Sequence, residues 1–145
     1  MKFDLKQKWP SPSNPKPVII IGAGGIVRDA HLPAYKLAKI PVKGTLDLDM
    51  QRSKALAADF EISNVYSNIT EAVADNGTNA VYDIAVPPSN IANIIQELPD
   101  GAATLIQKPM GSDQDQAREI RAICRTKGLK SAMNFQLRFS PMMLA

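Results

Sequence analysis

Three glycines and one acid in this sequence have the spacing of a phosphate-binding turn. Gly22, Gly24 and Gly25 follow the apolar run 18–21, and Asp47 follows a second strand-like run, 42–46. In a dinucleotide-binding turn the first glycine permits a tight bend, and the second lets the backbone approach the diphosphate at a helix N-terminus. An acid about 20 residues further on accepts hydrogen bonds from a ribose. These residues therefore predict a dinucleotide site, and a turn that holds a bare phosphate is the alternative.

Val27 stands where the third glycine of this pattern usually lies. That position serves the close packing of helix against strand rather than phosphate contact, so a valine does not exclude binding. We expect the helix and strand to sit slightly further apart. Gly25 and Ile26, which open the helix, are expected to complete the cofactor contacts of the turn.

The acid decides which cofactor the turn favours. The Asp47 carboxylate would accept hydrogen bonds from both ribose hydroxyls and would repel a 2′-phosphate, so NAD is expected and NADP is disfavoured. Asp49 is the competing candidate, although it falls beyond the expected strand end. Arg52 is near enough in sequence to soften the preference.

Segments of strand type and of helical periodicity alternate along the chain and must position these residues. Strands are expected at residues 18–21, 42–46, 64–66, 80–86, 102–106 and 130–135. Helices are expected at 25–39, 52–60, 69–75 and 91–98, and a last one is capped by Ser112; Asn68 and Glu71 form a capping pair for the third. Regular alternation with short connections predicts an α/β fold, a doubly wound parallel sheet (Rossmann) of about six strands with helices on both faces.

The two ends of the chain differ from this pattern. Residues 1–16 are proline-rich and are expected to form an N-terminal arm, and residues 17–137 to form the dinucleotide-binding domain. Residues 138–145 end in an apolar stretch, Pro141 to Leu144, which has no evident partner in such a domain. We interpret them as the start of a connection to an absent C-terminal substrate domain; a short tail that folds back is the alternative.

Composition excludes several classes of protein. The formal net charge of +3 is scattered along the chain, which does not indicate nucleic-acid binding. No apolar run has the length of a membrane span, and no secretory signal precedes the arm. The one cysteine, Cys124, excludes a disulfide framework or a CxxC metal site, and we expect it to be a small buried thiol. A cytoplasmic setting is the default expectation, and no metal site is predicted.

Longer motifs extend the likeness beyond the turn. The segments "GAGGIVRDAHLPAY", "LDLDMQRSKALAADF", "AVPPSN", "IQKPMG" and "NFQLRFSP" resemble successive segments of the N-terminal domain of the Gfo/Idh/MocA oxidoreductases. The resemblance runs from Pro17 to Pro141. It implies an NAD(P)-dependent oxidoreductase that moves a hydride between a nicotinamide and a hydroxyl of a sugar or polyol, and a full-length protein that is a homo-oligomer.

The resemblance assigns Lys108 as the catalytic residue, an acid/base beside the nicotinamide and the substrate hydroxyl. A lysine can remove the hydroxyl proton when burial and nearby positive charge lower its pKa toward the working pH. An exposed lysine before a turn proline, Pro109, is the alternative. Gln107 replaces the usual glutamate: it can still hydrogen-bond the nicotinamide end but offers no charge there. Asn90 replaces a usual histidine. The only histidine, His31, is expected to order its own helix and the neighbours of that helix rather than to act on the substrate.

The resemblance also places apolar and polar groups around the cofactor. Ala85, Pro87 and Pro88 follow the fourth strand at the sheet edge where ligands bind in open α/β folds. Asn134 and Arg138 come after the sixth strand and are expected near the nicotinamide. A pairing of Arg138 with a carboxylate at the domain junction is equally open.

The resulting interpretation is the NAD-binding domain of an oxidoreductase, inactive as this fragment. Three alternatives stay open: an NAD-dependent glycosidase of the same family, a non-catalytic nucleotide-binding regulatory protein, and a structural fragment without a ligand. The regulatory protein would keep Gly22, Gly24 and Asp47 but would not need Lys108.

Overall fold

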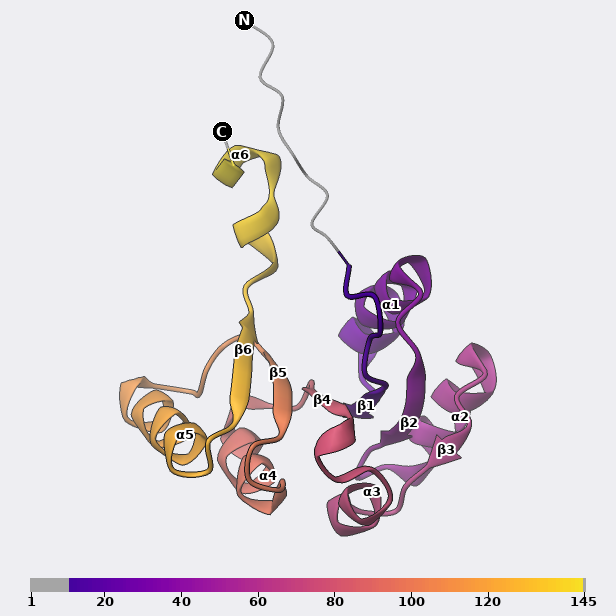
Figure 1. The fold of residues 1–145 in the computed structure, drawn as a ribbon, viewed down its shortest axis with the longest axis horizontal. Coiled ribbons are helices and arrows are strands. Elements are labelled where there is room, and N and C mark those ends of the chain that lie inside the picture. The colour runs from indigo at the N-terminus through magenta and orange to yellow at the C-terminus, as the bar shows by residue number, and fades with distance from the viewer. Residues whose placement is uncertain (1–10, 145) are drawn as a thin grey trace, which may run out of the picture.

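The predicted doubly wound parallel sheet is confirmed. A computed structural model describes residues 11–144, and all six of its strands are parallel, in the order β3-β2-β1-β4-β5-β6 (Figure 1). The strands are β1 (Val18–Ile21), β2 (Val42–Leu46), β3 (Asn64–Val65), β4 (Val81–Ile84), β5 (Ala103–Gln107) and β6 (Lys130–Asn134). β5 runs one residue beyond the expected end, so Gln107 is its last residue rather than the first of the loop.

Helices connect the strands in the predicted order. They are α1 (Leu32–Ala38), α2 (Met50–Phe60), α3 (Ile69–Asn76), α4 (Ile91–Glu97), α5 (Gln114–Thr126) and α6 (Pro141–Leu144). α2 begins two residues earlier than expected because the Asp49 carboxylate caps it, accepting the N–H groups of Gln51 and Arg52. The predicted helix 91–98 is preceded by a 3-10 turn, Pro88–Asn90.

Two apolar clusters hold the layers together. The first joins β1, β4 and β5 to α3, α4 and α5, and Tyr82, Ile95 and Ile120 lie at its centre. The second lies on the opposite face of the sheet, where Ile20 and Val27 pack with Leu56 of α2. Helices therefore cover both faces, as Figure 1 shows with α3, α4 and α5 along one side of the strands. The four residues of β1 are all buried, as expected for a strand covered on both sides.

The helix after the glycine turn differs from the expected continuous α-helix over 25–39. The helix begins with α-helical residues 25–26, Val27–His31 form a π-helical turn, and Leu32–Ala38 continue as regular α-helix. The Leu32 N–H donates to the Val27 carbonyl, five residues back. Pro33 explains the departure, because it has no N–H to continue the α-helical ladder at that point. The wider turn begins at Val27, which is fully buried against the second cluster.

Helix caps were predicted in part. Asn68 caps α3 by accepting the Glu71 N–H at 2.8 Å, as expected. The Glu71 carboxylate, however, accepts from the backbone and hydroxyl of Ser67, one residue before the cap. The cap of α5 is Asp113 and not Ser112, because the Asp113 carboxylate accepts the Gln116 N–H. Gly128 has a positive φ, 60°, after the last turn of this helix.

Cys124 and the chain ends complete the fold. Cys124 is a free thiol, but it is half-buried rather than buried and accepts a hydrogen bond from the Ser131 hydroxyl at 3.3 Å. Residues 1–10 of the predicted arm lie outside the described residues. Beyond β6 the chain forms a 3-10 turn, Gln136–Phe139, and the short α6, on which Met142 and Met143 are exposed. Among the helices that the structure describes, none combines the length and apolar character needed to cross a membrane.

The buried Tyr82 predicts a loss of stability in strong base. Burial, and then the charge of Tyr66, raises the pKa of Tyr82 to about 12 from its ordinary 10.0. The neutral phenol is thus favoured in the folded state: its contribution is fully present below pH 10 and is lost as the pH rises toward 12. Urea unfolding between pH 9 and pH 12 should show the free energy of unfolding falling. Tyr82→Phe should make that fall shallower, and an equally steep fall in this variant would contradict the assignment.

Candidate cofactor site

The first glycine of the turn is required by its backbone and by its neighbours. Gly22 has a φ of 103°, and a Cβ built on it would lie 2.4 Å from the carbonyl oxygen of Ala85. Its N–H donates to the Leu46 carbonyl, and the Ala85 N–H donates to the Ile21 carbonyl, both at 2.8 Å. The carboxyl ends of β1, β2 and β4 therefore meet at Gly22. Only a residue without a side chain fits that junction.

The second glycine faces open space. A Cβ built on Gly24 would meet no atom within 4 Å. Gly25 and Ile26 follow at the start of the helix and are both exposed. The first N–H groups of a helix have no partner within it and carry the positive end of its dipole. The turn thus offers free space and backbone donors to an anion at the position predicted from the sequence.

Asp47 lies directly against this turn. One carboxylate oxygen accepts the Ala23 N–H at 2.7 Å, and the other accepts the Asp49 N–H at 2.8 Å. Asp49, the competing acid, is used instead to cap α2 and to pair with Arg52 at 3.3 Å. The structure therefore brings Asp47, not Asp49, to the glycine turn. Between these two acids lies Leu48, whose side chain is 99% exposed and which the sequence reasoning had not singled out.

The loop after β4 forms the next part of the same edge. Ala85 is half-buried beside Gly22, and Pro87 and Pro88 lead into the 3-10 turn that ends at Asn90. The Asn90 N–H donates to the Pro87 carbonyl at 3.0 Å. The residues predicted here are Ala85, Pro87 and Pro88. Ala85 lies against Gly22, so this loop adjoins the glycine turn.

Gln107 and Lys108 come at the carboxyl end of β5 and differ in exposure. Gln107 is buried, and the oxygen of its side-chain amide (Oε1) accepts the Lys108 backbone N–H at 2.8 Å. The Lys108 side chain is exposed. The amide nitrogens of Gln107 and of Asn134, on β6, lie 3.2 Å and 3.3 Å from Nε2 of His31. Both amides are therefore turned toward His31 in this structure.

His31 belongs to a buried polar cluster that the sequence reasoning largely missed. Its Nδ1 lies 2.8 Å from an oxygen of Asp83, which is fully buried on β4, and the Tyr35 hydroxyl donates to the same oxygen at 2.8 Å. Burial, together with the charge and hydrogen bond of Asp83, raises the pKa of the Tyr35 hydroxyl, which stays a donor. A signal did exist: Asp83 interrupts the apolar run "AVYDIAV", and a buried charge requires partners.

Arg138 is the predicted residue that the structure does not bring to the others. It lies in the 3-10 turn Gln136–Phe139, and its guanidinium stands 5.7 Å from the ring centre of Phe135. Within residues 11–144, no carboxylate forms an ion pair with it. Its expected place near the nicotinamide, or at a domain junction, stays a prediction.

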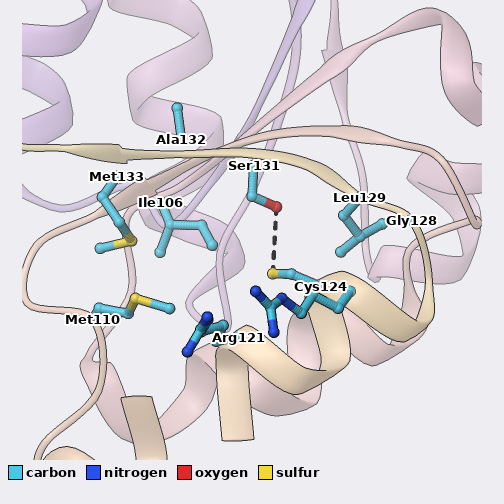
Figure 2. Close-up of a pocket in the computed structure, with 10 residues that line it drawn as sticks. Ile106, Met110, Arg121, Cys124, Gly128, Leu129, Ser131, Ala132 and Met133 are labelled. Carbon is cyan, nitrogen blue, oxygen red and sulfur yellow. Dashed lines mark hydrogen bonds between the residues drawn. The ribbon is translucent and has the colours of Figure 1, made fainter. Parts of the chain in front are cut away.

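A cavity of about 370 Å³ lies away from this edge, between β6 and α5. Figure 2 shows Ile106, Met110 and Met133 on one side of it and Arg121 and Cys124 of α5 on the other. Successive residues of a strand point to opposite faces, so Ile106 and Met133 face away from Gln107 and Asn134. This cavity is not part of the site at the glycine turn.

The parallel sheet order, the glycine turn and the acid against it define a dinucleotide-binding domain of Rossmann type. Residues 16–135 match the family described as "Oxidoreductase family, NAD-binding Rossmann fold". The chain belongs to this family, the Gfo/Idh/MocA oxidoreductases, as its motifs had indicated.

Two curated relatives illustrate the range of the family. An uncharacterized protein of Saccharomyces cerevisiae is 30% identical over 121 residues, which cover 80% of this chain and 34% of the relative. The NADP-dependent D-xylose 1-dehydrogenase 2 of Haloferax volcanii is 26% identical over 124 residues, 85% of this chain and 38% of the relative. The chain thus spans little more than a third of the length of either protein.

Solved structures show the same fold. An oxidoreductase from Agrobacterium radiobacter, in complex with NAD+, L-tartaric acid and magnesium, has a TM-score of 0.73 at 19% identity and covers 86% of this chain and 36% of its own. The 3-ketoreductase of Actinomadura kijaniata, in complex with TDP-benzene and NADP, has a TM-score of 0.73 at 24% identity, with 89% and 41% covered. Neighbours of this fold therefore include binders of each cofactor.

The same substitution is expected to destabilise the protein strongly at Gly22 and hardly at all at Gly24. Gly22→Ala forces a side chain into the Ala85 carbonyl at a positive φ and should lower the free energy of unfolding by about 3 kcal/mol or more. Gly24→Ala is the matched control, because its Cβ enters open space, and should change stability by less than about 1 kcal/mol. Urea denaturation followed by circular dichroism measures both. Equal stability of the two variants would contradict the described crowding.

Proposed function

We propose that this chain is the cofactor domain of an oxidoreductase that transfers a hydride between NAD and a hydroxyl of a sugar or polyol. The observation that carries the proposal is the juxtaposition of Gly24, where a Cβ would meet open space, with Asp47, which accepts a backbone hydrogen bond from the same turn. The H. volcanii relative, a D-xylose 1-dehydrogenase, supports the substrate class. A cytoplasmic location and a homo-oligomeric full-length protein are parts of the same proposal and rest on the sequence.

The residues present fit a dinucleotide. A diphosphate would be held by the backbone of Gly24, Gly25 and Ile26, at the helix start where no side chain intervenes. Asp47 uses one hydrogen bond on each oxygen, and a carboxylate has about four acceptor sites, so it retains capacity for two ribose hydroxyls. Its negative charge would repel a 2′-phosphate, and the neighbouring Leu48 offers no positive charge to offset it. NAD is thus preferred over NADP.

Lys108 is proposed as the acid/base. When bound, the nicotinamide would supply the hydride acceptor, and Lys108 would take the proton from the substrate hydroxyl. Lys108 follows β5 at the same edge of the sheet as the glycine turn, and its side chain is exposed. None of the described residues buries the Lys108 side chain. The substrate and the rest of the full-length protein would therefore have to exclude water around it. The 145-residue chain alone is therefore expected to bind NAD and to be nearly inactive.

Binding of NAD to the 145-residue chain tests the cofactor part of the proposal. The wild type should bind NAD more tightly than NADP in isothermal titration calorimetry. Gly24→Ala, which keeps the fold, should weaken NAD at least about tenfold because its methyl occupies the space of the diphosphate. Asp47→Asn should reduce the preference for NAD over NADP, since it removes the charge that repels the 2′-phosphate. No binding of either nucleotide to the folded wild type would overturn the cofactor assignment.

Turnover tests the role of Lys108 in the natural full-length protein. Lys108→Met should lower kcat for polyol oxidation by about 10²- to 10⁴-fold while NAD affinity changes little, because the lysine moves a proton rather than holding the cofactor. Lys130→Met, an exposed lysine on β6, is the matched control and should keep normal turnover. Unchanged function in Lys108→Met would favour the non-catalytic regulatory alternative. Turnover by purified protein that retains NAD and needs none added would favour the glycosidase alternative.

A further inference from the structure

The buried cluster around His31 fixes its own pattern of protons. A backbone N–H can only donate, so the atom of Gln107 that faces the Lys108 N–H, at 2.8 Å, must be the carbonyl oxygen. The other end of the amide, its NH₂ group, therefore faces Nε2 of His31 at 3.2 Å. An NH₂ group also only donates, so Nε2 must be the bare, accepting nitrogen. The imidazole proton then lies on Nδ1 and is donated to Asp83 at 2.8 Å.

Asp83 is well placed to enforce this arrangement. It is fully buried, and one oxygen accepts from both His31 and the Tyr35 hydroxyl, while the other has no partner among the described residues. A buried carboxylate without donors is costly, so Asp83 holds Nδ1–H strongly. The imidazole is contacted by Asp83 of β4 and by the side-chain amides of Gln107 (β5) and Asn134 (β6). Tyr35 of α1 donates to the Asp83 oxygen that faces the imidazole.

We propose that His31 is a positioning residue, a neutral imidazole that acts through Gln107 on the backbone of Lys108. In this arrangement Asp83 sets the tautomer, His31 accepts from the Gln107 amide, and the opposite end of that amide accepts the Lys108 N–H. The start of the loop that carries Lys108 is thereby tied to the π-helical turn after the glycine motif. The relevance of this tie to catalysis rests on the proposed function, whereas the proton pattern does not.

The glutamine at 107 is what keeps the imidazole neutral. A glutamate there would accept the Lys108 N–H with one oxygen and present its second oxygen to Nε2, which would then need a proton. His31 would carry protons on both nitrogens between two carboxylates. The formal charge of the cluster would be minus one in either case, since the added carboxylate and the added proton cancel. Glutamine in place of glutamate thus changes the protonation of His31 and leaves the net charge beneath Lys108 as it was.

The protonation state can be read directly because His31 is the only histidine. Long-range ¹H–¹⁵N correlation spectra of the ¹⁵N-labelled 145-residue chain at pH 7 should show that Nδ1 of His31 is protonated and that its Nε2 is not. Gln107→Glu should convert both to the protonated, imidazolium type. Asn134→Asp should leave Nε2 bare, because the Gln107 NH₂ group still donates to that nitrogen. Gln96→Glu, an exposed site on α4, is the matched control and should leave both signals unchanged. A protonated Nε2 in wild type or in Asn134→Asp, or a neutral His31 in folded Gln107→Glu, would overturn the proposal.

The positioning step has a separate readout, which does not depend on cofactor or turnover. His31→Ala should speed amide hydrogen exchange at Lys108 by about tenfold relative to Ile20 on β1, because the Gln107 amide loses the acceptor that orients it. A general loss of stability would instead speed exchange mainly at Ile20, in the buried strand β1, and would lower this ratio. An unchanged ratio would refute the positioning role even if NAD binding proved normal. If the spectra are as expected but NAD does not bind, the pattern of protons is still supported and only the proposed function is refuted.

Discussion

The close approach of Gly22 to the end of β4 is the constraint on which the rest of this domain depends. With 2.4 Å between a would-be Cβ and the Ala85 carbonyl, the chain must turn there without a side chain and at a positive φ. That turn delivers the backbone of Gly24 and Gly25 to the open edge of the sheet. It also directs the following helix back over β4, so that His31 reaches Asp83. One steric condition therefore sets both the anion-binding backbone and the buried polar cluster.

The buried cluster has a cost that its geometry offsets. Asp83 lies within an otherwise apolar strand, where an unpaired charge would destabilise the fold by several kcal/mol. Its two donors, His31 and Tyr35, both come from the helix that follows the glycine turn. The π-helical turn and Pro33 shape the segment that presents them. The irregular helix start is thus consistent with a requirement for these contacts and not only with the sequence of the turn.

The succession of strands and helices along the chain, the parallel sheet and the glycine turn could be predicted because they depend on local patterns: apolar runs, their spacing, and glycines at fixed positions. The π-helical turn was not predicted, because the sequence reasoning placed one continuous helix over 25–39 and took no account of Pro33 in its interior. The cap of α5 was wrong because Ser112 and Asp113 are adjacent and both suit a cap. His31 was expected to order its helix and the neighbours of that helix, but its partners were not identified. Asp83, Gln107 and Asn134 lie 52, 76 and 103 residues away, and no local pattern links them to it. Long-range polar contacts of this kind depend on strand register, which the sequence specifies only indirectly.

Asp47 and Asp83 show that the position of a carboxylate relative to the end of its strand decides which groups it can contact. Each carboxylate lies near the carboxyl end of a strand adjacent to β1, and each is tied to the segment after it. Asp47 follows its strand and is partly exposed. Within residues 11–144 it accepts two backbone hydrogen bonds, so it keeps acceptor capacity for a ligand. Asp83 lies one residue inside its strand, where the helix covers it and directs its charge onto His31 and Tyr35. A difference of about two positions relative to the strand end therefore separates a carboxylate suited to bind from one suited to orient.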